Sequence, residues 1–287
     1  MVKGRRFRVE SSKYAGYCYG VERALKLAMA AAESSEGPIR TLGPIIHNPQ
    51  VIDELVAKGI NSVDDIDGVD YGVVIIRTHG VGPQVIEAAR VKGLTIIDAT
   101  CPFVSKAQRR ADELVGEGYQ VIIVGERDHP EVAGILAHAG GKALVVESAD
   151  DLPEERLDRR IGVVVQTTQS PRLLNEVLAA VTVRCGELRV FNTICNATVQ
   201  RQDAAAALAK RADVVVVVGG KNSANTSRLA RICEEAGAAT YHVETAAELQ
   251  PHWFDTATLV GVTAGASTPE RLINDVVSRL TAISEEP

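Results

Sequence analysis

Three of the five cysteines lie at corresponding positions in the chain, and each can offer a thiolate to a metal. Cys18, Cys101 and Cys195 each follow an extended stretch and directly precede a segment with helical periodicity. We therefore expect each thiol at a turn from a strand into a helix. Three thiolates that converge on one point can bind zinc with a fourth ligand, or an iron-sulfur cluster in which one iron has no protein thiolate.

The spacing of these cysteines favours the cluster over zinc. Structural zinc sites commonly use close Cys-x-x-Cys pairs, and the sequence contains none. Widely separated single cysteines suit a large cofactor at a junction between lobes. A 4Fe-4S cluster with three cysteine ligands leaves one iron open, and an open metal position is what substrate coordination requires. One catalytic cluster per chain is the resulting prediction.

The other two cysteines do not lie at such junctions. Cys185 and Cys233 are predicted to be buried apolar residues, since free cysteine is among the most buried residue types. Five is an odd number, and the cysteines are spread over more than 200 residues. This usage fits a reducing compartment better than a disulfide framework.

A second group of residues with useful chemistry lies at further junctions of the same kind. It comprises His47, His79, His129 with Glu131, Thr167, Thr168, Ser223, Asn225 and Ser267. Such residues are also common in turns simply because they cap helices. Together, imidazoles, hydroxyls and amides near helix N-termini form an anion-binding surface, for which a phosphate or diphosphate is the natural ligand. Glu131, expected in a loop, can supply protons to a reducing centre.

The elements that must position these residues follow an alternating β/α pattern, which predicts parallel α/β layers. Short buried strands are predicted at 73–76, 120–124, 162–165, 214–218 and 259–263. Helices are predicted at 21–34, 49–58, 105–116, 197–212 and 227–236. Neither a P-loop nor a GxGxxG motif is present, so no motif supports nucleotide binding.

An internal repeat organises these elements into three lobes. A junction that contains Gly43, Gly125 or Gly219 follows each cysteine by 24 or 25 residues, and a third junction lies further on in each unit. Loops at the carboxyl ends of parallel strands bind ligands. We therefore predict three similar α/β lobes with small parallel sheets around a pseudo-threefold axis and a central cluster. The lobes are expected at 19–102, 103–195 and 196–287, after an N-terminal segment at 1–18.

Composition narrows the functional class further. The formal net charge of −6 argues against a general nucleic-acid binder. The N-terminus lacks the apolar stretch of a signal peptide, and no apolar run reaches the length of a membrane span. These features predict a cytoplasmic protein with no nucleic-acid or membrane partner.

With these residues in these positions, the sequence resembles a known family, the 4-hydroxy-3-methylbut-2-enyl diphosphate reductases, also called IspH or LytB. The resemblance covers nearly the whole chain. The matching motifs, in order, are Cys18-Tyr19-Gly20-Val21, His47-Asn48, Thr78-His79-Gly80, Asp98-Ala99-Thr100-Cys101-Pro102, His129-Pro130-Glu131, Gln166-Thr167-Thr168, Cys195, Gly220-Lys221-Asn222-Ser223 and Thr263-Ala264-Gly265-Ala266-Ser267.

The resemblance implies an activity and a role for each site residue. The enzyme would catalyse the last step of the methylerythritol phosphate pathway, removing the allylic hydroxyl of its substrate to give isopentenyl and dimethylallyl diphosphates. Ferredoxin or flavodoxin would donate single electrons. The cluster ligands would be Cys18, Cys101 and Cys195, the diphosphate ligands His47, His79, His129, Ser223, Asn225 and Ser267, and the residues near the substrate hydroxyl Thr167 and Glu131, with Glu131 relaying protons.

Two departures and three alternatives accompany this interpretation. Ala224 replaces a second serine that many relatives carry, and the stretch before Cys18 gives no clear first strand. A cluster-dependent dehydratase resembling the quinolinate synthases would use an open iron without net reduction, but its motifs are absent. An oxygen-sensing cluster protein would not need His129 with Glu131. A zinc-stabilised phosphosugar-binding module is the least favoured alternative.

Overall fold

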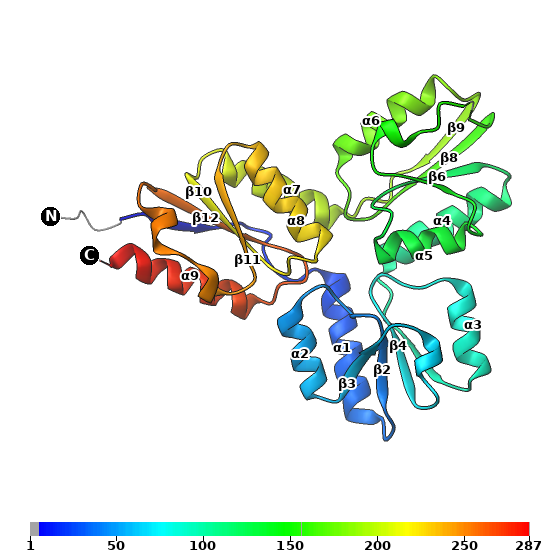
Figure 1. Cartoon of the computed structure of the whole chain (residues 1–287), viewed down its shortest axis with the longest axis horizontal. Helices are drawn as coiled ribbons and strands as arrows, with labels where there is room; N and C mark the ends of the chain where they lie inside the picture. The colour runs from blue at the N-terminus through cyan, green and yellow to red at the C-terminus, as the bar shows by residue number, and fades with distance from the viewer. Residues whose placement is uncertain (1–5, 156, 287) are drawn as a thin grey trace. The chain divides into compact units, whose positions relative to one another are not determined.

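The computed structural model describes residues 6–155 and 157–286, which fall into two compact units (Figure 1). The first unit contains the N-terminal segment up to Tyr19, the short segment His47–Val51 and the chain from Asn196 onwards. The second contains Gly20–Ile46 and Ile52–Cys195.

Three four-stranded parallel sheets form the framework. The sheet of the first unit consists of β1 (Arg8–Ser11), β10 (Val214–Val218), β11 (Ala239–Val243) and β12 (Leu259–Ala264). The second unit has one sheet of β2 (Ile39–Leu42), β3 (Ile60–Val63), β4 (Val73–Ile76) and β5 (Thr95–Asp98). Its other sheet consists of β6 (Gln120–Val124), β7 (Leu144–Val146), β8 (Arg160–Val165) and β9 (Glu187–Phe191). The predicted fold class of three small parallel-sheet lobes is confirmed.

The three sheets share one strand order, with a difference in where the last strand comes from. The orders are β3-β2-β4-β5, β7-β6-β8-β9 and β11-β10-β12-β1. In the third sheet the edge position next to β12 is filled by β1, from the start of the chain, which pairs in register from Arg8 with Leu259 to Ser11 with Val262. The sequence did not predict β1. Each of the three edge strands β1, β5 and β9 leads towards one of the junction cysteines.

Burial explains which strands the sequence could predict. Five of the six strands with neighbours on both sides were predicted (β4, β6, β8, β10 and β12), and almost every residue in them is buried. The sixth, β2, was missed because Arg40 and Thr41 interrupt its apolar pattern. Edge strands such as β5 and β9 are only partly buried, so their sequences lack the continuous apolar run that marks a central parallel strand.

Nine α-helices connect the strands in the described ranges. They are α1 (Tyr19–Ser34), α2 (Pro49–Ala57), α3 (Pro83–Val91), α4 (Pro102–Gly116), α5 (Pro130–His138), α6 (Pro171–Thr182), α7 (Asn196–Ala209), α8 (Ala224–Glu235) and α9 (Glu270–Glu285). The five predicted helices are all present, with ends within three residues of the predicted ones. Helices α2 to α6 each begin at a proline, whose missing N–H and fixed φ suit the first helical position. No helix among the described residues is long and apolar enough to cross a membrane.

The helix that follows a junction cysteine packs closely on the next sheet, and two glycines make this possible. Leu114 of α4 lies so close to Gly162 of β8 that a Cβ at Gly162 would be 2.7 Å from both methyl carbons of Leu114. Likewise, a Cβ at Gly261 of β12 would lie 2.8 Å from the Cγ of Leu208 in α7. Both leucines lie 13 residues after their cysteine, and both are buried. The repeat therefore extends from the junctions into the packing of the core.

We expect Leu114→Ala to lower the free energy of unfolding by about 2–5 kcal/mol, because it leaves a cavity against β8 that Gly162 cannot fill. Val115→Ala on the same helix is the matched control, since Val115 is 41% exposed. Urea unfolding followed by circular dichroism measures both. Equal, small changes in the two variants would contradict the close packing of α4 on β8.

Candidate functional site

Two of the junction cysteines lie in the second unit, and both are held by one type of backbone hydrogen bond. The Cys101 N–H donates to the Thr78 carbonyl at 2.9 Å, and the Cys195 N–H donates to the Thr167 carbonyl at 3.0 Å. Thr78 follows β4 and Thr167 follows β8, the strands next to β5 and β9. Each bond therefore joins two neighbouring loops at the carboxyl edge of one sheet.

The third junction cysteine has the same environment in the first unit. The Cys18 N–H donates to the Ala266 carbonyl at 3.2 Å, in the loop that follows β12. All three cysteines are half-buried, and each lies directly before a helix or at its N-cap. The sequence predicts equivalent junctions for the three cysteines, and the structure brings each cysteine to the carboxyl edge of its own sheet.

The remaining cysteines differ from these three. Cys233 is fully buried in α8, its thiol lies 3.9 Å from the Ala205 carbonyl, and burial raises its pKa to about 12. The prediction of a buried apolar residue is confirmed for Cys233. It is wrong for Cys185, which is half-buried beside Arg184.

Glu131 is a carboxyl group enclosed by protein. It was expected in a loop, but it is the second residue of α5, and only 1% of its surface is exposed. The Thr167 N–H donates to Oε1 at 2.6 Å, and the Thr167 hydroxyl donates to Oε2 at 2.8 Å. Thr167 also accepts the Cys195 N–H, so one residue connects the carboxyl group with a junction cysteine.

Burial and hydrogen bonding act in opposite directions on Glu131. Desolvation is the larger effect and disfavours the carboxylate, while the two bonds from Thr167 favour it, and the nearby Glu126 disfavours it further. The net result raises the pKa of Glu131 from 4.5 to about 7. A carboxyl group with this pKa can hold and release a proton near neutral pH.

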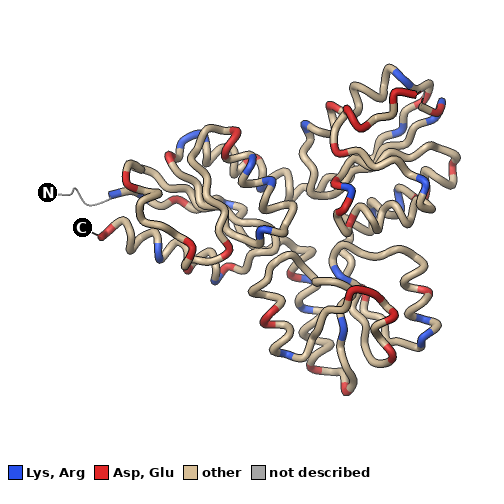
Figure 2. The backbone as a smooth tube through the Cα atoms, in the orientation of Figure 1, with Lys and Arg blue, Asp and Glu red and all other residues tan. Residues whose placement is uncertain are grey.

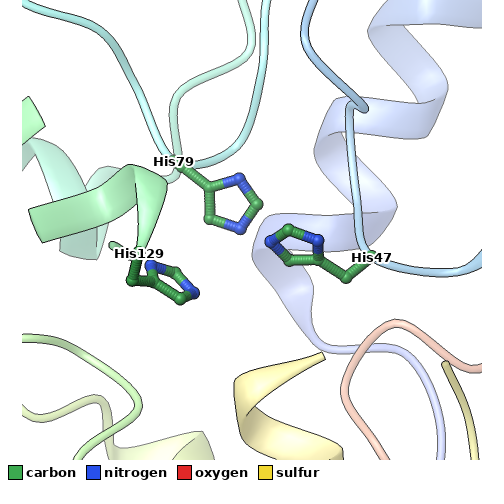
Figure 3. Close-up of side chains that lie close together, drawn as sticks. All are labelled: His47, His79 and His129. Carbon is green, nitrogen blue, oxygen red and sulfur yellow. The ribbon is translucent and has the colours of Figure 1, made fainter. Parts of the chain in front are cut away.

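Two histidines lie at the N-terminal end of α5. His129 is the N-cap of α5, and its Nδ1 accepts the Glu131 N–H at 3.1 Å, which leaves Nε2 as the ring atom that can donate. The rings of His79 and His129 meet edge to face with their centroids 5.3 Å apart. Figure 3 shows these two rings, and also His47, whose segment belongs to the first unit. The second unit thus combines two half-buried imidazoles with a buried acid.

The first unit carries the other predicted anion-binding residues. The Ser267 hydroxyl donates to the His47 carbonyl at 3.0 Å. Ser223 is the N-cap of α8, where its hydroxyl accepts the Thr226 N–H at 3.3 Å. The Nδ2 of Asn225, which is 7% exposed, has no hydrogen-bond partner among the described residues.

The KNS segment does not bring its lysine to this group. Lys221 is 60% exposed and pairs with Glu248 at 2.8 Å, so its charge is compensated at the surface. Ala224 is the first residue of α8, next to Ser223. The polar groups of this loop that remain for an anion are therefore neutral.

Thr168 has a structural partner, since its hydroxyl accepts a hydrogen bond from Gln166 Nε2 at 3.0 Å. The fully buried Gln166 also accepts the Glu126 N–H at 2.8 Å through Oε1. Thr168 and Gln166 therefore fix the loop that presents Thr167 to Glu131.

Sequence reasoning missed three side chains that hold the junction loops. Arg23 of α1 donates to the Thr100 and Asp98 carbonyls at 3.1 and 3.2 Å, just before Cys101. Arg201 of α7 donates to the Gly16 and Tyr17 carbonyls at 2.7 and 3.2 Å, just before Cys18. Gln108 of α4 donates to the His79 carbonyl at 3.4 Å. The available signal was a polar residue on an otherwise buried helix face, as with Gln108 and Arg201.

Comparison with known proteins identifies relatives over nearly the whole chain. A family model described as LytB protein matches residues 9–281. The 4-hydroxy-3-methylbut-2-enyl diphosphate reductase of Geotalea uraniireducens is 48% identical over 279 residues, covering 97% of this chain and 99% of the relative. The enzyme of the same name from Aquifex aeolicus is 46% identical over 277 residues, covering 96% of each protein.

Two solved structures are also similar. One is an (E)-4-hydroxy-3-methyl-but-2-enyl diphosphate reductase described as the terminal enzyme of the non-mevalonate pathway. It has a TM-score of 0.71 and 45% identity, and the match covers 96% of this chain and 99% of that protein. The other is the E-1-hydroxy-2-methyl-but-2-enyl-4-diphosphate reductase of Plasmodium falciparum, with a TM-score of 0.90, 27% identity, and coverage of 96% and 88%.

The raised pKa of Glu131 makes a prediction about stability. Because the folded-state pKa of about 7 lies above the ordinary value of 4.5, the stabilisation from this group is fully present below pH 4.5 and is lost as pH rises through 7. The glutamine in Glu131→Gln does not titrate. Between pH 4.5 and 7, the unfolding free energy of this variant should therefore decrease by about 3 kcal/mol less than that of the wild type. Urea unfolding at a series of pH values measures it. Glu33→Gln, at an exposed position, is the control, and parallel profiles for wild type and Glu131→Gln would contradict the prediction.

Proposed function

This chain belongs to the LytB family, and we propose that it is a 4-hydroxy-3-methylbut-2-enyl diphosphate reductase. The reaction breaks the allylic C–O bond of (E)-4-hydroxy-3-methylbut-2-enyl diphosphate. Two electrons and two protons enter, water leaves, and isopentenyl or dimethylallyl diphosphate is formed. The names of the relatives support this substrate, and one of the similar structures is described as the terminal enzyme of the non-mevalonate pathway. The resemblance also implies a cytosolic enzyme.

The observation that carries the proposal is the buried Glu131 carboxyl group. A leaving hydroxide needs a proton, and an acid with a pKa of about 7 is partly protonated at neutral pH. The two hydrogen bonds from Thr167 fix the orientation of both carboxyl oxygens. We assign Glu131 as the proton donor and Thr167 as the residue that orients it and contacts the substrate hydroxyl.

The junction cysteines fit the ligand set of an iron-sulfur cluster. Cys18, Cys101 and Cys195 are half-buried, and their amides are hydrogen-bonded to neighbouring loops, so the backbone at each cysteine is held in place within its own unit. Helix N-termini next to them stabilise negative charge. When bound, a 4Fe-4S cluster would supply electrons and an open iron as a Lewis acid. The residues therefore fit the group in type, exposure and local placement.

We assign the diphosphate to neutral donors. The proposed ligands are His47, Ser223, Asn225 and Ser267 in the first unit and His79 and His129 in the second. The buried Asn225 Nδ2 without a partner supports this assignment, because a buried donor left unsatisfied is costly unless a ligand completes it. Because Nδ1 of His129 accepts the Glu131 N–H, Nε2 is the ring atom that would donate to the diphosphate. Holding the diphosphate would orient the allylic end of the substrate.

Electrons are proposed to come from an external one-electron donor such as ferredoxin or flavodoxin. The chain contains no GxGxxG motif for a dinucleotide.

Anaerobically purified protein should reduce the hydroxylated diphosphate with dithionite and a viologen mediator. Glu131→Gln should retain iron and bind the substrate, yet lose turnover by a factor on the order of 10² to 10⁴, because general acid catalysis contributes about that much. Glu33→Gln, which makes the same chemical change at an exposed site, should behave as wild type. Unchanged turnover in Glu131→Gln would remove this residue from proton transfer.

Iron and acid-labile sulfide analysis tests the ligand assignment separately. Serine at Cys18, Cys101 or Cys195 should reduce bound iron and sulfide to below half of the wild-type content, because each substitution removes one thiolate. Cys185→Ser is the matched control at a half-buried cysteine and should retain the cluster. Zinc in place of iron, or equal metal loss in the control, would overturn the assignment.

A further inference from the structure

The exposed side of α4 carries a group of residues that the proposed reaction does not use. We call it the α4 cationic face and define it as Phe103, Lys106, Arg109 and Arg110. Phe103 is 42% exposed, and Lys106 and Arg109 are exposed. Because residues three and four apart share a helix face, these four side chains form one contiguous surface.

The charges on this face are only partly compensated. Arg110 stacks on the Phe191 ring at 4.4 Å and pairs with Glu113, which Arg189 also neutralises. Lys106 and Arg109 have no ion pair among the described residues. The chain as a whole has a formal net charge of −6, so these two neighbouring cations form a local positive patch on an acidic protein. Charged residues of both signs are spread over the other elements (Figure 2).

Comparison of the internal repeats shows that Lys106 lacks the structural role of its equivalent residue, Arg23. Arg23 lies five residues after Cys18, and it holds the backbone carbonyls of Asp98 and Thr100. Lys106 occupies the same offset after Cys101, yet it has no such hydrogen bond among the described residues. The position that fastens a loop in the first repeat is therefore left open to solvent in the second.

The same residues border a hollow in the surface. Lys106, Arg109, Arg110 and Glu113 line a depression of about 360 Å³. α4 starts directly at Cys101, which is its N-cap. At a rise of 1.5 Å per residue, Lys106 and Arg109 lie only about 8 and 12 Å along the helix axis from that cysteine.

We propose that the α4 cationic face docks a small acidic protein that carries one electron at a time. The inference rests on the proposed function, since a reductase with a cluster at Cys101 needs electrons delivered close to that residue. Opposite charges accelerate encounter and orient the partner. Redox partners use small transient interfaces, and the α4 cationic face combines two uncompensated cations with an exposed aromatic ring.

The double substitution Lys106→Glu with Arg109→Glu tests this docking in the holoenzyme. The probe is a reduced acidic flavodoxin, and the measurements are its KM, the ratio of flavodoxin-driven to viologen-driven turnover, and the Kd of the complex at several salt concentrations. We expect KM and Kd to rise on the order of tenfold or more, the turnover ratio to fall, and the salt dependence of Kd to weaken, because steering depends on these charges.

The matched control is Lys58→Glu with Lys142→Glu, which changes the net charge equally at two exposed lysines of the same unit. An equal effect in both double variants, or none in the α4 variant, would overturn the proposal. If wild type shows no turnover even with viologen, the proposed function fails, whereas the Kd comparison still decides docking. Phe103→Ala should raise Kd without changing its salt dependence.

Discussion

The fixed position of each junction cysteine depends on one hydrogen bond between neighbouring loops. The amides of Cys18, Cys101 and Cys195 donate to carbonyls in the loop after the adjacent strand. In a parallel sheet both loops emerge at the carboxyl edge, so the sheet itself brings donor and acceptor together. The backbone at each cysteine is therefore held by this bond directly before a helix. This local constraint is the same in all three sheets.

Thr167 joins the proposed acid to one of these cysteines. Its carbonyl accepts the Cys195 amide, and its own amide and hydroxyl bind Glu131. The carboxyl group is buried strongly enough that desolvation outweighs both hydrogen bonds and raises its pKa to about 7. A single loop therefore sets both the place of the acid and its proton affinity. The reductase proposed here depends on that combination.

The uncompensated charges of Lys106 and Arg109 on α4 differ in their use from the other cations near the junction cysteines. Arg23 and Arg201 hold backbone carbonyls before Cys101 and Cys18, whereas Lys106, at the position equivalent to Arg23, does not hold a carbonyl among the described residues. A repeated scaffold keeps the helices and the junctions, so a side chain freed from a structural role can serve a partner. The proposed donor-docking surface arises from this departure from the repeat.

The sequence by itself determined the three junction cysteines, the parallel α/β class and most central strands, because buried β-branched runs and repeated spacing are local features. It did not reveal β1, because a strand with exposed ends acquires its partner β12 from the opposite end of the chain. It also placed Glu131 in a loop. Only the tertiary structure decided that this carboxyl group lies buried on a helix against Thr167, since burial and pKa depend on residues 36 positions apart.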